Sequence, residues 1–248
     1  MWPFPRIIAH RGGGTLAPEN TLAGLRRGLS HGFHAVEFDV MLSRDGIPVL
    51  MHDPAFGRTV AGEGQVAETS AEDLCAMDAG AWFGPTHAGE KVPSFAQAID
   101  FCLDNRIWMN VEIKPAPGFA VQTGRAAAQM LQARLADGQA PGGITPLFSS
   151  FSMDALQAAR EAAPGIPRGF LIGTIPDQWE DILRELDAVA LHTNHKHLTP
   201  ELAKAVKEAG YGLFCYTVDD PERAREILSW GVDAFCTDRL DLIGPDFA

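Results

Sequence analysis

The fold of this 248-residue chain is indicated first by the stretch AVEFDV at residues 35–40, which has the composition of a buried strand that carries two acids. Residues i and i+2 of a strand share a face, so Glu37 and Asp39 point the same way. The stretch WMNVEIK at residues 108–114 repeats the arrangement with Glu112 and Lys114. Both stretches therefore predict buried strands whose ends carry charged side chains on one face.

Strand candidates recur through the whole chain, and most are followed by an amphipathic stretch with helical spacing. The expected helices cover residues 21–30, 94–105, 119–135, 152–163, 177–186, 200–209 and 221–230, with Asn20 as the expected N-cap of the first. Only Leu240–Phe247 follows the last strand, so the last helix is expected to be truncated. The expected strands are Arg6–Ala9, Ala35–Val40, Trp108–Ile113, Thr145–Phe148, Arg168–Ile172, Ala188–Leu191, Leu213–Thr217 and Val232–Cys236.

Alternating strands and helices predict an α/β fold with a parallel sheet. Eight strand–helix units without a change in composition favour a closed (β/α)8 TIM barrel over a doubly wound sheet. The lack of a GxGxxG motif after the first strand also argues against a doubly wound, dinucleotide-binding sheet. Residues 54–93, which follow an extended run at Pro48–Met51, are too long for a connecting loop. They predict a small inserted subdomain between the second strand and the second helix. The expected organisation is a single barrel domain, residues 1–248, with this insertion.

Composition excludes several classes of partner. The net charge of −12 and the pI near 5.0 argue against a broad surface for nucleic acid or anionic membrane, which would need clustered Lys and Arg. The N-terminus lacks the apolar region of a signal peptide, and the sequence has no apolar run of about 18 residues. The four cysteines have no zinc-ligand spacing. We therefore expect a reduced, cytoplasmic protein that binds neither nucleic acid nor membrane, and the oligomeric state stays open.

Polar residues fall at the carboxyl ends of the expected strands, which is where barrel enzymes keep their chemistry. Seven of the expected barrel strands and the extended run at Pro48–Met51 end in this way, so their side chains are expected to converge on one site. The groups are His10-Arg11, Glu37 with Asp39, His52-Asp53, Glu112 with Lys114, Ser149-Ser150, His192 with Asn194, Tyr216-Thr217 and Thr237-Asp238.

Glu37, Asp39 and Glu112 are the candidate metal ligands. Inward carboxylates on buried strands are costly unless a cation compensates them, and one lysine cannot neutralise three acids. Three carboxylates suit Mg²⁺ or Ca²⁺ better than Zn²⁺, which prefers His and Cys. The alternative is a buried ion-pair cluster with Lys114 and Arg11, without a metal.

His10 and His52 each follow an apolar run and precede a charged residue, so the pair could serve as general acid and general base. Arg11 is a natural bidentate clamp for phosphate oxygens, and Lys114 adds a second positive charge. Glu19 either hydrogen-bonds to the site or complements the dipole of the first helix.

Aromatic residues near the strand ends could form an apolar wall for a substrate group, although each could equally belong to the core. They are Phe148, Phe151, Trp82, Phe83 and Tyr216. A second polar group, His192, Asn194, His195 and His197, has no common metal-ligand spacing and is expected to line the barrel mouth.

Several motifs together resemble those of the glycerophosphodiester phosphodiesterase family, in its order and over essentially the whole chain. The short length and the absent signal resemble its bacterial cytoplasmic subgroup. The motifs are His10-Arg11-Gly12, Pro18-Glu19-Asn20-Thr21, Glu37-Phe38-Asp39-Val40, His52-Asp53-Pro54 with Arg58-Thr59, Glu112-Ile113-Lys114-Pro115, Cys215-Tyr216-Thr217-Val218, Gly231-Val232-Asp233 and Thr237-Asp238.

The resemblance implies a TIM barrel with a small inserted subdomain. It also implies hydrolysis of small glycerophosphodiesters, with a divalent cation, to sn-glycerol 3-phosphate and an alcohol such as choline, ethanolamine or glycerol, in glycerol phosphate and phospholipid-degradation metabolism. By motif position it assigns metal ligation to Glu37, Asp39 and Glu112, acid–base roles to His10 and His52, and phosphate contacts to Arg11 and Lys114. Tyr216 and Asp219 stand where many members have Trp and Asn, so the wall around the leaving alcohol is expected to differ.

The sequence disfavours two rival functions. A phospholipase C or D acting on lipid phosphodiesters is disfavoured, because the sequence has no basic amphipathic helix. A barrel that only binds phosphodiesters is disfavoured by the intact histidines and carboxylates. The leaving alcohol, the metal used in the cell and the formation of a cyclic phosphate intermediate stay open.

Overall fold

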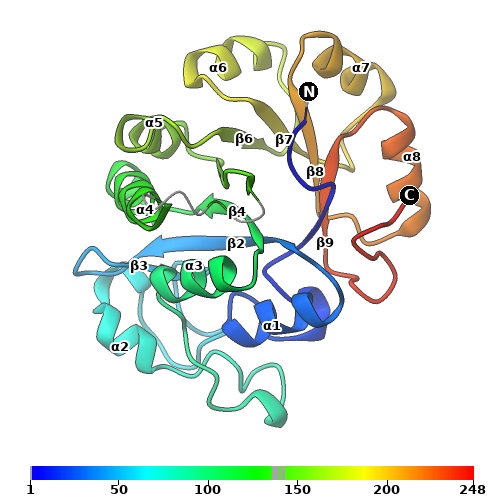
Figure 1. The fold of residues 1–248 in the computed structure, drawn as a ribbon. Helices are drawn as coiled ribbons and strands as arrows, with labels where there is room; N and C mark the ends of the chain where they lie inside the picture. The colour runs from blue at the N-terminus through cyan, green and yellow to red at the C-terminus, as the bar shows by residue number, and fades with distance from the viewer. Residues whose placement is uncertain (1, 136–139, 141–142) are drawn as a thin grey trace.

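The computed structural model describes residues 2–135, 140 and 143–248. Its nine strands form one sheet in the order β1-β9-β8-β7-β6-β5-β4-β2-β3, and an additional β1–β2 pairing closes it (Figure 1). All strands but β3 pair in parallel, so the predicted (β/α)8 barrel is confirmed. The barrel strands are β1 (Ile7–Ala9), β2 (Ala35–Leu42), β4 (Trp108–Ile113), β5 (Leu147–Ser150), β6 (Arg168–Ile172), β7 (Ala190–Asn194), β8 (Gly212–Tyr216) and β9 (Ala234–Thr237).

Helices surround the barrel and follow its strands in order (Figure 1). Polar side chains start several of them: Ser94 begins α3 with a capping box that includes Gln97, and Thr21 begins α1. Asn20, the expected cap of α1, instead binds Asp39 in the site described below. Residues 238–248 contain turns, in agreement with the expected truncation. The helices are α1 (Leu22–Ser30), α3 (Phe95–Asp104), α4 (Ala120–Leu135), α5 (Met153–Ala162), α6 (Trp179–Leu186), α7 (Pro200–Glu208) and α8 (Pro221–Ser229).

Successive strand residues face the helices and the barrel interior in turn. Outward residues such as Phe38 and Val111 pack in the large core between barrel and helices. Phe148 also belongs to this core, which is the second of the two places considered for it, and it faces away from the barrel interior. A second core fills the interior and includes Ile8, Ala35, Trp108, Leu147, Phe214, Ala234 and Cys236, with Trp2 and Phe4 packed against it.

The insertion begins after β3 (Pro48–Leu50), which pairs antiparallel with β2 and matches the expected extended run at Pro48–Met51. It contains the helix α2 (Ala71–Ala76) and the short 3-10 turns η2 (Val66–Glu68) and η3 (Pro85–His87); a further 3-10 turn, η1 (Gly14–Leu16), follows β1. The segment lies beside α1 and α3 (Figure 1). Its apolar residues form a cluster of their own: Met41, Val49, Met51, Val60, Val66, Leu74, Ala79 and Val92.

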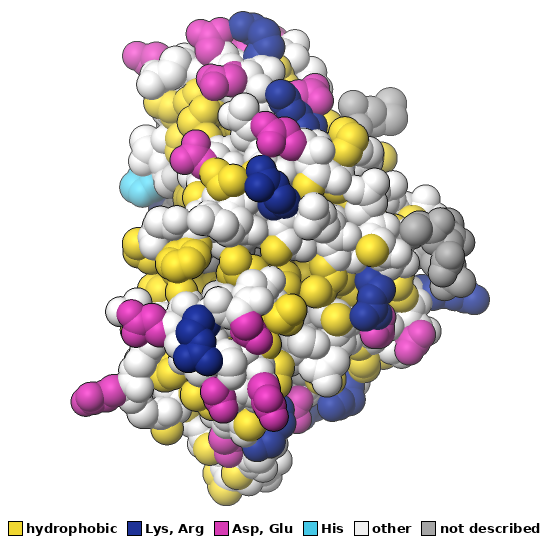
Figure 2. All heavy atoms as spheres, turned by 90° about the vertical axis from the view of Figure 1, so that its left-hand side faces the viewer, with side chains coloured by type: hydrophobic (Ala, Val, Ile, Leu, Met, Phe, Trp, Pro, Cys, Tyr) yellow, Lys and Arg dark blue, Asp and Glu magenta, His cyan; other side chains and the backbone are white. Residues whose placement is uncertain are grey.

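The outer face in Figure 2 shows basic and acidic side chains interspersed, with hydrophobic side chains between them. Among the described residues, no helix combines the length and the hydropathy needed to span a membrane.

Several strand boundaries differ from the sequence expectation by one to three residues, and the difference at β7 changes the interpretation of His192. The strand expected at Ala188–Leu191 is Ala190–Asn194, so His192 lies within β7 and not beyond it. Its side chain is 0% exposed and stacks on Phe214 at 4.4 Å between ring centroids. His192 therefore packs inside the barrel and does not line its mouth. This difference has a physical cause. His192 points into the barrel and packs there against the aromatic ring of Phe214, and an uncharged imidazole can be buried in such surroundings.

Candidate active site at the carboxyl ends of the barrel strands

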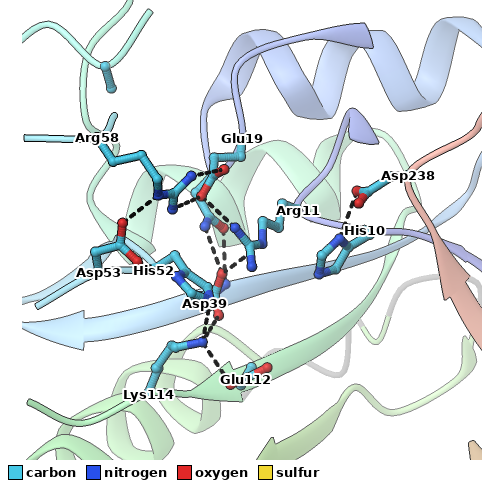
Figure 3. A network of polar contacts seen from close by, with 12 residues as sticks. His10, Arg11, Glu19, Asp39, His52, Asp53, Arg58, Glu112, Lys114 and Asp238 are labelled. Carbon is cyan, nitrogen blue, oxygen red and sulfur yellow. Dashed lines mark hydrogen bonds and ion pairs between the residues drawn. The ribbon is translucent and has the colours of Figure 1, made fainter. Parts of the chain in front are cut away.

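Three carboxylates meet where β2 and β4 lie side by side. Glu37 and Asp39 extend from β2 and Glu112 from β4, where Asp39 and Glu112 are paired in register. Each offers an oxygen, and these oxygens lie within 4.8 Å of one another. Glu37 and Asp39 are 4% and 1% exposed. The period of two in each strand thus places the acids together, as the sequence predicted (Figure 3).

The charges around these acids are unequal. Lys114 Nζ lies 3.4 Å from Asp39 Oδ1, and Arg11 Nε lies 3.6 Å from Asp39 Oδ2. Burial alone would raise the pKa of Asp39, but Lys114 and Arg11 outweigh it and lower this pKa. Burial and the neighbouring Asp39 raise the pKa of Glu37 to about 7 and that of Glu112 to about 8. Lys114 Nζ also lies 3.5 Å from Glu112 Oε1, so two cations are shared among three buried carboxylates.

The remaining carboxylate oxygens leave room for a further cation. Glu37 Oε1 and Glu112 Oε1 are buried and have no hydrogen-bond partner in the described part of the chain. A buried carboxylate without a compensating charge is costly. Hard divalent cations take oxygen ligands, so this donor set fits Mg²⁺ or Ca²⁺. An ion-pair cluster with Lys114 and Arg11 supplies only two cations for three buried carboxylates, and the pKa values of Glu37 and Glu112 stay raised in their presence.

Arg11 links the carboxylates to the loop after β1. It adopts a left-handed backbone conformation with φ of 49°, and its backbone N–H donates to Glu37 Oε2 at 3.0 Å. Its guanidinium donates to Glu19 Oε1 at 2.7 Å. Arg58, from the insertion, donates to both oxygens of Glu19 at 2.6 and 2.8 Å. Glu19 therefore contacts the site through two arginines. Of the two roles expected for it, this is the hydrogen bond to the site and not the interaction with the dipole of the first helix.

Both histidines are oriented by aspartates. His10 Nδ1 lies 2.7 Å from Asp238 Oδ1, and its Nε2 lies 3.8 Å from Glu37 Oε2. His52 Nδ1 lies 2.6 Å from Asp53 Oδ1, and Lys114 Nζ lies 2.5 Å from His52 Nε2 (Figure 3). A hydrogen bond between Nδ1 and an aspartate fixes the orientation of the imidazole ring and leaves Nε2 facing the carboxylates.

The two histidines differ in electrostatic surroundings. Burial would lower the pKa of His10, but its hydrogen bond to Asp238 and the nearby Glu37 outweigh burial and raise this pKa. Burial lowers the pKa of His52, and the positive charges of Arg11 and Lys114 oppose the effect of its acidic neighbours. Opposite shifts in two neighbouring groups are typical of an acid–base pair.

Three side chains of this network, Asp238, Asp53 and Arg58, appear in the sequence only as parts of motifs, and a fourth, Asn20, is expected there only as a helix cap. Asp53 holds both His52 and Arg58, and Asn20 Nδ2 donates to Asp39 Oδ2 at 2.8 Å. The signal for Asp53 was its adjacency to His52. No local signal exists for Asp238, which is 228 residues from its partner His10.

Two cavities adjoin the network and share His10 and Arg11. The first, of about 220 Å³, also contacts Glu37, His52, Asn110, Glu112, Lys114, Ser149, Phe151, Leu171, Phe214, Tyr216, Thr217 and Cys236. The second, of about 340 Å³, is lined by Gly14, Thr15, Glu19, Asp238 and, from the insertion, Trp82 and Phe83.

The proposed aromatic wall is therefore divided. Phe151, 50% exposed, packs edge-on against Tyr216 with ring centroids 5.8 Å apart beside the first cavity. The Tyr216 hydroxyl donates to the carbonyl of Ile172 at 2.9 Å. Since the hydroxyl is used in this bond, Tyr216 contributes its aromatic ring to the cavity wall. Trp82 and Phe83 belong to the second cavity.

Comparison with known proteins agrees with this architecture. The model of the glycerophosphoryl diester phosphodiesterase family matches residues 10–242. A glycerophosphodiester phosphodiesterase of Caldanaerobacter subterraneus is 32% identical, over 94% of this chain and 93% of the relative.

Solved structures give the same result. A phosphodiesterase of Oleispira antarctica, in complex with the product sn-glycerol-3-phosphate, is 36% identical with a TM-score of 0.87 and covers 94% of this chain and 93% of its own. The glycerophosphodiester phosphodiesterase of Thermotoga maritima shares the fold, with 23% identity and a TM-score of 0.73 over 98% of both chains. The family match, spanning nearly the whole barrel and the carboxylates and histidines at its mouth, shows that the chain belongs to the glycerophosphoryl diester phosphodiesterase family.

Proposed function

We propose that this chain, as a single barrel domain with its insertion, hydrolyses glycerophosphodiesters to sn-glycerol 3-phosphate and an alcohol. Choline, ethanolamine and glycerol are the expected alcohols, and the reaction belongs to glycerol phosphate and phospholipid-degradation metabolism. The observation that carries the proposal is a cluster of three carboxylates, two of which line one cavity together with two aspartate-bound histidines and Arg11. The product complex of the Oleispira antarctica relative supports the choice of substrate.

Glu37, Asp39 and Glu112 would hold a divalent cation, Mg²⁺ or Ca²⁺. The support for this is their mutual distance and the two buried oxygens without a partner. When bound, such a cation polarises phosphoryl oxygens and lowers the pKa of a coordinated hydroxyl. The positive charges of Arg11 and Lys114 lie at the same cavity and would bind the remaining phosphate oxygens.

His10 and His52 would move the protons. The glycerol C2 hydroxyl attacks phosphorus, its proton passes to His52 Nε2, and the P–O bond to the alcohol breaks as His10 gives that oxygen a proton. In the second step water opens the cyclic phosphate, and the two histidines exchange roles.

Two observations support this division of roles. Lys114 Nζ lies at hydrogen-bond distance from His52 Nε2, and an ammonium group can only donate, so this nitrogen carries a lone pair. His10 lines both cavities, so a glycerol moiety in the first and a leaving alcohol in the second would both lie beside it.

The test is a panel of glycerophosphodiesters with choline, ethanolamine or glycerol as the leaving group, assayed for release of sn-glycerol 3-phosphate. We expect turnover of all three. A diacyl phosphatidylcholine in detergent is the control for lipid phosphodiesterase activity, and we expect no turnover of it. Binding of the three diesters without product release would contradict the proposal.

A further inference from the structure

Two buried polar side chains that border the first cavity have no partner. Asn110 on β4 is 2% exposed, Ser149 on β5 is 0% exposed, and both line the cavity. Asn110 Oδ1 and Ser149 Oγ find no hydrogen-bond partner among the residues that the structure describes. Buried polar groups in proteins are nearly always paired, so an unpaired group that faces a cavity points to a ligand. Neither side chain has a role in the mechanism proposed above.

Strand register places these two side chains beside the carboxylates. Asn110 pairs with Glu37 across β2 and β4, and Ser149 pairs with Glu112 across β4 and β5. Paired residues of parallel strands point to the same face, which here is the barrel interior. A molecule whose oxygens reach the carboxylate centre therefore lies within a few atoms of the Asn110–Ser149 pair.

The cavity wall also has an apolar part. Leu171 on β6 and Phe214 on β8 contribute aliphatic and aromatic surface, and Tyr216 uses its hydroxyl elsewhere. The group that meets the pair must be small and cannot be an anion, because the cavity holds about 220 Å³ and Glu37 and Glu112 stand beside the pair. It must also donate to an amide oxygen and exchange a hydrogen bond with a hydroxyl. An alcohol hydroxyl on a short carbon chain has these properties.

We propose that Asn110 and Ser149 bind the terminal C1 hydroxyl of the glycerol moiety and thereby select deacylated glycerophosphodiesters. This inference rests on the proposed function, which places the C2 hydroxyl and phosphorus at the carboxylate centre. In an acylated substrate the C1 oxygen has no proton to donate, and it carries a chain that has to fit beside the buried Asn110 and Ser149. A site built to hydrogen-bond a hydroxyl rejects an analogue that lacks it, because the protein groups are left unpaired.

The test compares two phosphocholine diesters. One is sn-glycero-3-phosphocholine and the other its propane-1,2-diol analogue, which keeps the C2 hydroxyl and lacks only the C1 hydroxyl. We expect the wild-type kcat/KM to favour the parent by about 100-fold or more. Asn110→Leu and Ser149→Ala should each lower kcat/KM for the parent by about 10-fold and leave that for the analogue nearly unchanged.

Thr193→Val is the matched control. Thr193 on β7 is also fully buried, and its Oγ1 has no partner within the described part of the chain, but it does not line the cavity. This variant should keep the wild-type preference. Thermal unfolding of each variant checks that the barrel is intact.

Equal wild-type kcat/KM for the two diesters would overturn the inference, and this comparison needs no variant. An unchanged preference in both folded variants would also overturn it. Failure of the wild-type protein to hydrolyse either diester would contradict the proposed function instead, so the two failures are distinguishable.

Discussion

Asp238 Oδ1 lies 2.7 Å from His10 Nδ1, although the two residues stand 228 positions apart in the chain. The contact spans the closure of the barrel, where β1 pairs with β9. It fixes which ring nitrogen of His10 faces the carboxylates. Asp53 does the same for His52 at 2.6 Å, from the adjacent position in the sequence. The acid–base pair is thus oriented by one local and one long-range contact.

Asp238→Asn tests the long-range contact. The amide keeps the shape of the carboxylate but can offer Nδ1 either an N–H or an oxygen, so the ring is held less firmly. We expect kcat to fall by about 10- to 100-fold, less than the full contribution of a general acid, with KM little changed. Steady-state kinetics of wild type and variant on sn-glycero-3-phosphocholine would measure this. A kcat equal to that of the wild type would show that Asp238 does not position His10.

His10→Ala and His52→Ala should each lower kcat by about 10²–10⁴-fold, the usual share of general acid–base catalysis. Stability should change little, because both side chains border the cavities and not the core. Urea unfolding gives the matched measurement of stability. Retention of near wild-type turnover by either variant would assign that histidine a structural role only.

The C2 hydroxyl of the substrate is tested by an analogue that lacks it, a propane-1,3-diol phosphodiester. An intramolecular nucleophile held beside phosphorus can have an effective molarity on the order of 10⁵ M or more. The analogue should therefore bind but turn over very slowly, and it should act as a competitive inhibitor. Comparable kcat for analogue and parent would instead indicate direct attack by water.

His192 makes the stability of the fold depend on pH. Burial lowers the pKa of His192 from 6.5 to about 3. Below pH 6.5 the unfolded chain binds a proton that the folded chain does not, so the free energy of unfolding falls as pH falls toward 3. Acidification from about pH 7 to pH 5.5 should therefore lower the free energy of unfolding by about 1 kcal/mol through this imidazole.

The matched variant for this effect is His192→Leu, which cannot titrate. Urea unfolding of both proteins at the two pH values isolates the contribution of the imidazole from that of the acids. The wild type should lose about 1 kcal/mol more than the variant on acidification. Equal losses in the two proteins would mean that His192 is protonated in the folded state.

The sequence allowed much of this site to be predicted, because period-two alternation in β2 and β4 is a local signal. It placed Ser149 among the strand-end groups but missed Asn110, and it could not show that both are unpaired, since that depends on the register between strands. The sequence also could not reveal the Asp238–His10 contact, which depends on barrel closure. The error at β7 arose because a histidine next to apolar residues suggests a strand end, whereas this imidazole is buried uncharged against Phe214.

The carboxylate centre is tested separately by Glu112→Gln, which preserves shape and removes one charge. Titration calorimetry with Mg²⁺ or Ca²⁺ should show affinity at least about 10-fold weaker than in the wild type, whereas thermal stability without metal should change much less. Glu180→Gln, on the exposed surface of α6, is the control for the loss of one negative charge. Equal affinities in wild type and Glu112→Gln would exclude Glu112 as a ligand.

The most direct test of the central claim is release of sn-glycerol 3-phosphate from sn-glycero-3-phosphocholine by protein treated with EDTA, before and after a divalent cation is restored. The account predicts that activity is lost in chelator and returns with Mg²⁺ or Ca²⁺, because Lys114 and Arg11 supply only two cations for three buried carboxylates. In addition, Glu37 Oε1 and Glu112 Oε1 have no hydrogen-bond partner in the described part of the chain. Full activity in EDTA, with no metal detected in the protein by elemental analysis, would contradict it.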